Sequence, residues 1–141
     1  MLQEKNDYYG ILSIKKLASE ILYWTELPEW DACCIGTYMM IEKVGSGGSG
    51  FRKLYVEFLK EAIAFIPEIK SNHCISKMEK IHKLYRTLGK KFFYAGRNGD
   101  EKTLFEIQEC LEEIYVLEKD FWETISDICN LYSSDTITVE V

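Results

Sequence analysis

The sequence contains no long apolar run and no surplus of basic residues. Its longest uninterrupted apolar stretch, Ala62–Ile66, has five residues and ends at Pro67, well short of the roughly 20 residues that a membrane span requires. Lys and Arg number 17 against 23 Asp and Glu, for a formal net charge of −6. These two absences predict no membrane contact and argue against a dedicated nucleic-acid-binding protein, in which a basic surplus is typical.

Cysteine is present, but it lacks the spacing of a disulfide framework or a metal site. The five cysteines include no Cys-x-x-Cys pair, and the adjacent Cys33 and Cys34 cannot form an ordinary disulfide with each other. Each cysteine lies in an apolar periodic segment, where a free thiol behaves as a small hydrophobe. The N-terminal residues are polar and acidic, with no secretory signal visible. The sequence therefore predicts a reduced, cytoplasmic protein.

The composition is that of one globular domain. Hydrophobic residues make up 47% and charged residues 28% of the 141 positions, a balance that excludes a disordered chain. We expect residues 1–132 to form a single helical domain and residues 133–141 to form a C-terminal tail. Within that tail, residues 136–141 alternate like a strand but have no evident partner strand.

Apolar residues recur at helical spacing along most of the chain, which predicts an all-α fold of about five helices packed as a bundle. The expected helices cover residues 9–24, 30–44, 51–66, 74–95 and 101–132. Residues 35–41 have mixed propensity, so a short strand is the alternative there. Pro67 ends the third helix because its ring removes a hydrogen-bond donor. The expected inner face of that helix consists of Leu54, Tyr55, Phe58, Leu59, Ala62 and Phe65.

Charge divides the last two expected helices. Residues 70–97 carry eight basic side chains and one acidic side chain, whereas residues 100–127 carry ten acidic and two basic side chains. The turn Gly96–Gly99 between them is short, so we expect a long antiparallel helix hairpin in which the two opposite fields face each other. We favour this interpretation over nucleic-acid binding by the basic helix.

A glycine-rich segment, Gly45–Gly50, lies between the second and third expected helices. Its four glycines in six residues permit positive φ angles and let backbone N–H groups converge, as in anion-binding nests. The segment opens onto a helix N-terminus, where Ser49 is a plausible N-cap. Arg52 and Lys53 occupy the first turn, where cations oppose the helix dipole. We therefore expect an anionic group nearby.

Two kinds of anion meet that expectation. One is a bound phosphate or carboxylate ligand, which the planar guanidinium of Arg52 can bind bidentately. The other is an internal carboxylate such as Glu118, which interrupts the apolar stripe of the last helix. The segment could also be a plain flexible turn or an engineered linker, and it lacks the Gly-Lys-Ser/Thr ending of a P-loop. The candidate ligand- or partner-facing residues are Gly45, Gly47, Gly48, Ser49, Gly50 and Arg52, with Tyr55 and Glu118 in support.

This segment and its flanks resemble a known family. The similar parts are Tyr9-Gly10, the stretch Glu42–Gly48, the stretch Phe51–Ala62 and Leu117-Glu118. Over roughly residues 8–127 the chain resembles the C-terminal helical domain of unknown function that follows the N-terminal domain of butirosin biosynthesis protein H and its relatives. The similarity of the flanks favours a natural loop over an engineered linker.

The resemblance implies a non-catalytic accessory or substrate-side module of an acyltransferase or cysteine-peptidase-like protein. In that family the N-terminal domain carries the presumed Cys and His chemistry, with an acyl-carrier-protein thioester as donor in the butirosin case. This chain has no counterpart of that domain, so we suspect it as the partner, either as a fused domain or as a subunit. We expect no cofactor and no metal. A stand-alone homo-oligomeric helical protein and, less favoured, a thiol-dependent acyltransferase stay open.

The sequence offers only weak candidates for a catalytic thiol, a metal site or a base-stacking surface. A Cys–His nucleophile would draw on Cys74 with its neighbour His73, or with His82 two turns later, but core cysteines are favoured. Zinc would need about four nitrogen or sulfur ligands, which only tertiary placement could assemble here. The pair Glu79 and His82 lacks the second copy that a di-metal bundle requires. Aromatic residues are expected in the core and not in a base-stacking platform.

Overall fold

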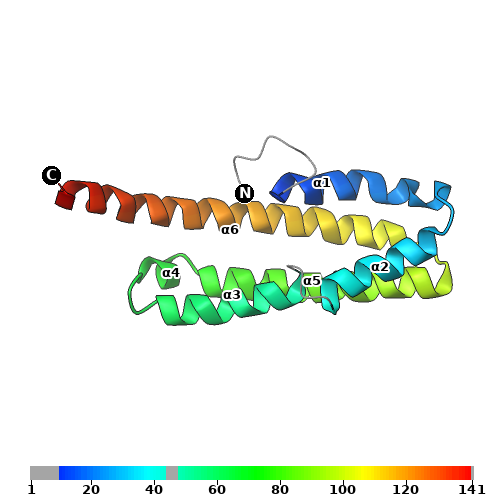
Figure 1. Ribbon diagram of the computed structural model, residues 1–141, viewed down its shortest axis with the longest axis horizontal. Helices are drawn as coiled ribbons and strands as arrows, with labels where there is room; N and C mark the ends of the chain where they lie inside the picture. The colour runs from blue at the N-terminus through cyan, green and yellow to red at the C-terminus, as the bar shows by residue number, and fades with distance from the viewer. Residues whose placement is uncertain (1–9, 44–47, 141) are drawn as a thin grey trace.

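The computed structural model describes residues 10–43 and 48–140, with side chains as far as residue 133 (Figure 1). No strand occurs within these ranges, so the all-α prediction is confirmed. Residues 35–41 lie inside a helix. The elements in chain order are α1 (Gly10–Glu20), the 3-10 helix η1 (Ile21–Glu26), α2 (Trp30–Glu42), α3 (Ser49–Ala62), α4 (Glu68–Ser71), α5 (Cys74–Asn98) and α6 (Thr103–Glu140).

Two long antiparallel helices, α5 and α6, form the centre of the fold, which confirms the predicted hairpin (Figure 1). Gly99 ends α5 in the left-handed conformation, with a φ of 59°, and its N–H donates to the carbonyl of Ala95. This conformation favours glycine at helix ends. Asp100 then accepts hydrogen bonds from the backbone N–H of Lys102 and the hydroxyl of Thr103, at 3.0 and 3.2 Å, which starts α6.

Ion pairs join basic α5 to acidic α6, as the charge pattern predicts. Their side chains are partly or largely exposed, so each pair contributes only about 0–1 kcal/mol to stability. From one pair to the next, the residue number on α5 rises while the residue number on α6 falls, as an antiparallel alignment of the two helices requires. The pairs are Lys77–Asp120 at 3.0 Å, Lys80–Glu113 at 3.9 Å and Lys91–Glu106 at 3.6 Å.

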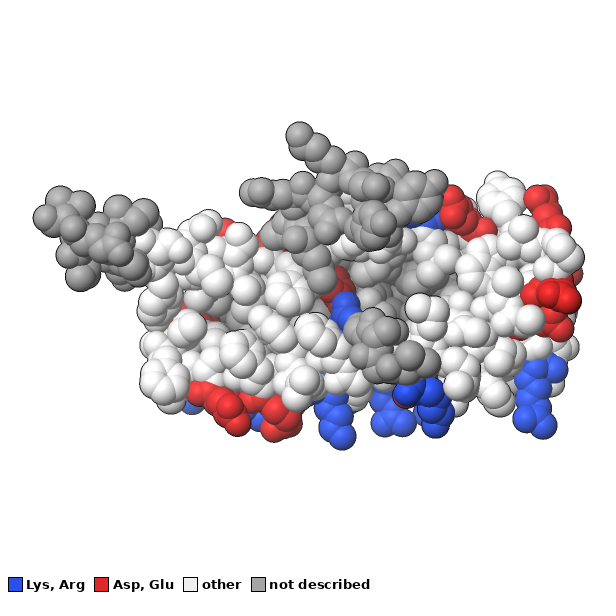
Figure 2. Space-filling model, in the orientation of Figure 1, with Lys and Arg blue, Asp and Glu red and all other residues white. Residues whose placement is uncertain are grey.

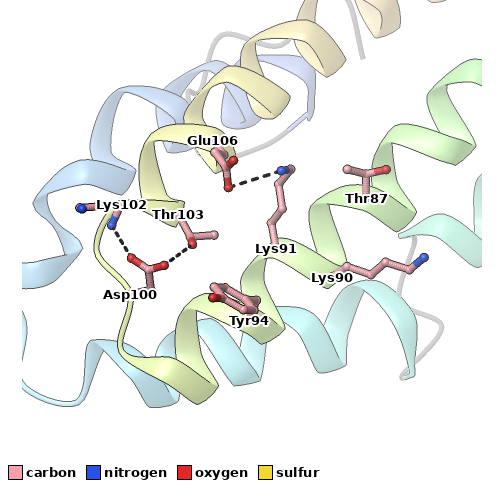
Figure 3. Close-up of a pocket in the computed structure, with 8 residues that line it drawn as sticks. All are labelled: Thr87, Lys90, Lys91, Tyr94, Asp100, Lys102, Thr103 and Glu106. Carbon is pink, nitrogen blue, oxygen red and sulfur yellow. Dashed lines mark hydrogen bonds and ion pairs between the residues drawn. The ribbon is translucent and has the colours of Figure 1, made fainter.

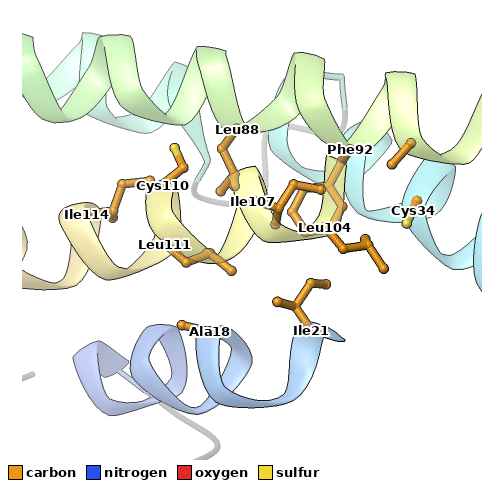
Figure 4. Close-up of a cluster of buried hydrophobic side chains, with 11 residues drawn as sticks. Ala18, Ile21, Cys34, Leu88, Phe92, Leu104, Ile107, Cys110, Leu111 and Ile114 are labelled. Carbon is orange, nitrogen blue, oxygen red and sulfur yellow. The ribbon is translucent and has the colours of Figure 1, made fainter. Parts of the chain in front are cut away.

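The shorter helices divide the molecule into two halves. At one end α1 and α2 pack on the central hairpin, and at the other end α3 packs on α5 and α4 lies beside the start of α5 (Figure 1). Each half has its own apolar core. The first core contains Ile21, Cys34, Leu88, Phe92 and Ile107 (Figure 4). The second core contains Val56, Leu59, Met78, Ile81 and Phe121.

The face of α3 that points inward differs from the prediction. Val56, which the prediction left out, is buried, and Leu59 is buried as predicted. Three of the six predicted inner residues are exposed to solvent. The physical reason is the side chain of Arg52, which is buried and bound to Glu118. That ion pair fixes the rotation of α3 about its axis, and the face that includes Phe58 then points outward. The exposed members of the predicted inner face are Leu54 (68%), Phe58 (54%) and Phe65 (82%).

The end of the chain also differs from the prediction. Helix α6 continues without a break through Glu140, so the strand-like interpretation of residues 136–140 is wrong. A helix satisfies its own backbone hydrogen bonds, whereas an isolated strand has no partner for them. The predicted boundary at residues 132–133 lies inside this helix, and Val141 lies outside the described residues. Within the described ranges, no helix has both the length and the apolar character that crossing a membrane requires.

Candidate functional site

The structure describes only the last part of the glycine-rich segment, because the candidates Gly45 and Gly47 lie outside the described residues. Gly48 occupies the N-cap position of α3. A Cβ atom there would overlap the backbone carbonyl of Ile41 in α2, so glycine is what lets the two helices approach at this point. Gly50 is different, since a Cβ on it would meet nothing within 4 Å.

Ser49 links α3 to both α2 and α5. Its hydroxyl donates to Oε1 of Glu42 at 3.0 Å, so the predicted N-cap role of Ser49 is wrong: Gly48 holds the N-cap position and the hydroxyl reaches α2 instead. The carbonyl of Ser49 lies 2.8 Å from Nδ1 of His82. Since a carbonyl only accepts hydrogen bonds, this ring nitrogen carries the proton. The glycine-rich segment is thus anchored by polar contacts where it enters α3.

Arg52 and Glu118, both singled out from the sequence, meet in the interior. The Arg52 Nη2 and Nε atoms lie 2.7 and 2.9 Å from Oε1 of Glu118, and the indole N–H of Trp122 donates to Oε2 at 2.8 Å. Only 8% of Arg52 and none of Glu118 is exposed. The guanidinium also lies over the ring of Tyr85, 4.4 Å from its centroid. An external anion at the α3 N-terminus would therefore compete with Glu118 for this guanidinium.

The electrostatics of this cluster are dominated by burial. Removal from water raises the pKa of the Tyr85 hydroxyl well above its usual range; the cation of Arg52 opposes this shift, and the hydrogen-bonded carboxylate of Glu118 adds to it. The tyrosine is therefore neutral at physiological pH and donates to the carboxylate. The cluster is a compensated ion pair surrounded by donors, which is an arrangement that fastens α3 to the middle of α6.

An aromatic surface runs from α3 to α6 beside this ion pair. Its central ring is Tyr55, whose centroid lies 5.9 Å from that of Phe121 and 5.3 Å from that of Trp122. On its outer side Tyr55 lies 6.1 Å from Phe51 and 5.3 Å from Phe58. Tyr55, which the sequence placed in a supporting role, thus connects the core of the second half to the exposed rings of α3.

An apolar groove continues this surface between α3 and the C-terminal half of α6. The cavity within it measures about 150 Å³. Leu59 and Ile128 lie at its base, Tyr55 and Phe58 lie on the α3 side, and Cys129 lies on the α6 side; no charged residue lines it. We call this feature the α3–α6 groove; α4 contributes one residue to it, and it is defined by Tyr55, Phe58, Leu59, Ala62, Ile66, Ile69, Ile125, Ile128 and Cys129.

A family model described as a domain of unknown function (DUF4872) matches residues 1–125. The chain belongs to the DUF4872 family. The match includes α1 to α5 and both members of the Arg52–Glu118 pair, and it supports the expected helical domain of unknown function. No curated protein and no solved structure matches the chain significantly.

A larger cleft of this DUF4872 domain, about 650 Å³, lies near the α5–α6 turn (Figure 3). Its lysines suggest an anion site, but they do not converge. Lys91 pairs with Glu106, and Asp100 accepts hydrogen bonds from the residues that begin α6. Figure 3 shows the side chains of Lys90 and Lys102 extending in opposite directions. The cleft therefore lacks the focused positive charge that binds a phosphate or carboxylate.

The thiols of the DUF4872 domain fall into two groups. Burial raises the pKa of Cys34 and Cys110 to about 11, and burial also raises the pKa of Cys74. These three thiols stay protonated near neutral pH, and a protonated thiol is a poor nucleophile and a poor metal ligand. Cys33 and Cys129 are exposed. Among the described residues, no three His, Cys, Asp or Glu side chains are grouped to hold a metal ion.

Part of this site could be found from the sequence and part could not. A cation in the first turn of a helix and a carboxylate inside an apolar stripe are both anomalies, and together they predict the Arg52–Glu118 pair. Trp122 follows Glu118 at the i, i+4 spacing that permits contact on a helix, a signal that was available. Tyr85 and His82 come from α5, and their approach depends on tertiary packing.

Proposed function

We propose that this DUF4872 domain is a non-catalytic accessory or substrate-side module of a butirosin-biosynthesis-H-like acyltransferase or cysteine-peptidase-like protein. In this proposal the glycine-rich segment and α3 face the partner domain. Three considerations support it: the sequence resemblance, the protonated state of the buried thiols and an exposed apolar face on α3.

The exposed apolar face of α3 is the observation that carries the proposal. Phe51, Leu54 and Phe58 are 42%, 68% and 54% exposed, although they are large hydrophobic residues at helical spacing. Rotating α3 to bury them would separate Arg52 from Glu118, and breaking one side of a buried ion pair costs about 3–5 kcal/mol. The fold therefore holds these side chains outward. Exposed apolar patches of this kind mark interaction surfaces.

The test is a binding titration between two purified proteins. One is this chain, and the other is the cysteine-peptidase-like domain that the proposal expects in the same reading frame or in an adjacent gene. We expect isothermal titration calorimetry to detect a complex, and Phe58→Asp to weaken it by about tenfold or more, which corresponds to about 1.4 kcal/mol. The matched control is Phe105→Asp, since Phe105 is 59% exposed near the start of α6, in the other half of the molecule.

Two results would contradict the proposal. One is the absence of binding by the unmodified chain, and the other is an equal effect of Phe58→Asp and Phe105→Asp. The alternatives have their own readouts. A thiol-dependent acyltransferase would form an acyl adduct on one cysteine when the chain alone is incubated with a thioester, which mass spectrometry detects. A homo-oligomer would show a concentration-dependent mass in light scattering.

A further inference from the structure

One side of the central hairpin has no described helix packed against it. On α5, Gly89 and Gly96 face α2, since a Cβ on either would overlap atoms of that helix. On α6, the amide of Gln108 donates to a carbonyl of α1. The ion pairs between α5 and α6 lie on a different side, where spacings of three and four residues place exposed neighbours beside them. We call this side the hairpin face, defined by Lys80, Lys83, Thr87, Lys90, Lys91 and Tyr94 of α5 and by Glu106, Glu109, Glu113 and Asp120 of α6.

The charges on the hairpin face form rows. Along the seam between the two helices, lysines of α5 pair with acids of α6. Further from the seam, Lys83 and Lys90 are exposed on α5 and Glu109 is exposed on α6, and none of the three has an ion pair with another described residue. Figure 3 shows the side chain of Lys90 pointing away from α6. The face therefore has a basic edge and an acidic edge whose outer charges are available to a second molecule.

The interhelical ion pairs fix the level of these three charges along the hairpin. Lys83 and Lys90 lie between the two lysines of a pair of ion pairs on α5, and Glu109 lies between the two corresponding acids on α6. The three unpaired charges thus share one level but lie on opposite edges of the face. The bracketing ion pairs are Lys80–Glu113 and Lys91–Glu106.

We propose that a second copy of this chain binds the hairpin face in a two-fold symmetric dimer, with α5 of each copy over α6 of the other. A two-fold axis that lies in the interface and runs parallel to the hairpin gives this arrangement and keeps every residue at its own level. Glu109 of one copy then lies between Lys83 and Lys90 of the other copy, and the contact occurs twice. A two-fold axis across the helices would instead place α5 on α5, with like charges opposed.

The size of the hairpin face suits such a dimer. Helix α5 has 25 residues, which gives a length of about 37 Å, and two helices side by side are about 20 Å wide. A contact along the whole of α5 would bury about 740 Å² on each copy and about 1,500 Å² in all, where stable interfaces bury about 1,200–2,000 Å².

Other occupants fit the charges less well than a second copy does. The face shown in Figure 2 is largely uncharged, and basic side chains project from its lower edge, on the side of the molecule where α5 lies with α2 and α3. A nucleic acid bound to the basic row of α5 would also meet the acidic row of α6, which repels phosphate. A protein surface of one sign would be repelled by one of the two rows. A second copy complements both rows at once.

The dimer goes beyond the proposed function and does not depend on it. Helix α3 packs on a different side of α5, where the carbonyl of Ser49 lies 2.8 Å from Nδ1 of His82. The exposed apolar face of α3 therefore stays free in the dimer. A dimer of this kind presents two such faces, one from each copy.

Reversal of charge on one edge at a time tests the pairing between copies. Lys83→Glu/Lys90→Glu makes the α5 edge acidic, and Glu109→Lys makes the α6 edge basic. In light scattering, we expect the mass of the unmodified chain to rise with concentration towards twice the mass of one chain. Each variant alone should dimerise more weakly by about tenfold or more. An equimolar mixture of the two variants should restore the dimer, because both contacts then join opposite charges.

A matched control separates local pairing from net charge. Lys43→Glu/Lys53→Glu changes the net charge by the same amount at exposed lysines of α2 and α3, and it should leave the dimer unchanged. Circular dichroism checks that all variants stay folded. Salt gives a second readout: raising it from about 0.1 M to about 1 M shortens the Debye length from about 10 to about 3 Å and should weaken the dimer of the unmodified chain by about tenfold.

Several outcomes would overturn this inference. A monomer at every concentration would do so, as would a dimer that survives both reversals or that the control weakens equally. A mixture that dimerises no better than its separate variants overturns the two-fold arrangement, and a mass that rises beyond two chains indicates an open head-to-tail contact instead. Phe58→Asp should weaken partner binding and leave the dimer intact, so a failure of the dimer and a failure of the proposed function are separate results.

Discussion

Arg52 and Glu118 lie 66 residues apart in the sequence and form a buried ion pair, with Nη2 of the arginine 2.7 Å from Oε1 of the glutamate. The pair joins the first turn of α3 to the middle of α6. It determines which face of α3 is buried and, through that, which apolar side chains are left for a partner. The stability of the domain and its proposed interface therefore depend on the same two residues.

Arg52→Met should lower the free energy of unfolding by about 3–5 kcal/mol, because the fully buried carboxylate of Glu118 would lose its charged partner. Urea denaturation followed by circular dichroism measures this change. Lys53→Met is the control, since the neighbouring lysine is exposed and surface substitutions usually change stability by less than about 0.5 kcal/mol. Equal stability of the two variants would show that the ion pair does not hold α3 in place.

The rotation of α3 can be tested with two adjacent residues. Phe58 is 54% exposed and Leu59 is 1% exposed. Leu59→Ala should cost about 2–5 kcal/mol because it opens a cavity in the core. Phe58→Ala should cost no more than about 1.5 kcal/mol, mainly from its contact with the ring of Tyr55. A larger loss for Phe58→Ala than for Leu59→Ala would mean that the opposite face of α3 is buried.

The glycines at the start of α3 should differ sharply in their tolerance of substitution. Gly48→Ala should destabilise the domain by about 1–3 kcal/mol, since the new methyl group would overlap the backbone of Ile41. Gly50→Ala should be neutral or stabilise by up to about 1 kcal/mol, because the site is open and alanine favours the helix. Thermal unfolding of both variants measures the difference, and similar melting temperatures would argue against the close approach of α2 and α3.

Stability should fall at alkaline pH. Burial raises the pKa of Cys34 and Cys110 from 9.0 to about 11, so the folded protein holds these protons more tightly than the unfolded chain does. The resulting stabilisation is fully present below pH 9.0 and is lost as the pH rises towards 11. The decrease can be followed by urea denaturation in a reducing buffer, and it should be shallower in Cys34→Ala/Cys110→Ala. An equally steep decrease in that variant would assign the effect to other groups.

The fold was largely predictable because apolar residues recur every three or four positions in α5 and α6, and because the charges of the two helices are complementary. The orientation of α3 was not predictable from periodicity. Its sequence carries two apolar faces, one with Val56 and Leu59 and one with Leu54 and Phe58, and either could be buried. The choice depends on a contact between Arg52 and Glu118 that periodicity does not encode. The helical end of α6 was missed because local alternation in residues 136–141 imitates a strand.

Hydrogen–deuterium exchange of the chain, alone and saturated with the cysteine-peptidase-like domain, shows which surface of the chain the partner covers. We expect slower exchange in the partner complex for peptides from α3, residues 49–62, and from α6 near residues 115–133. Peptides from α2, residues 30–42, serve as the internal reference and should exchange equally in both states. Protection confined to α2, or identical exchange throughout, would contradict docking through the exposed apolar face of α3.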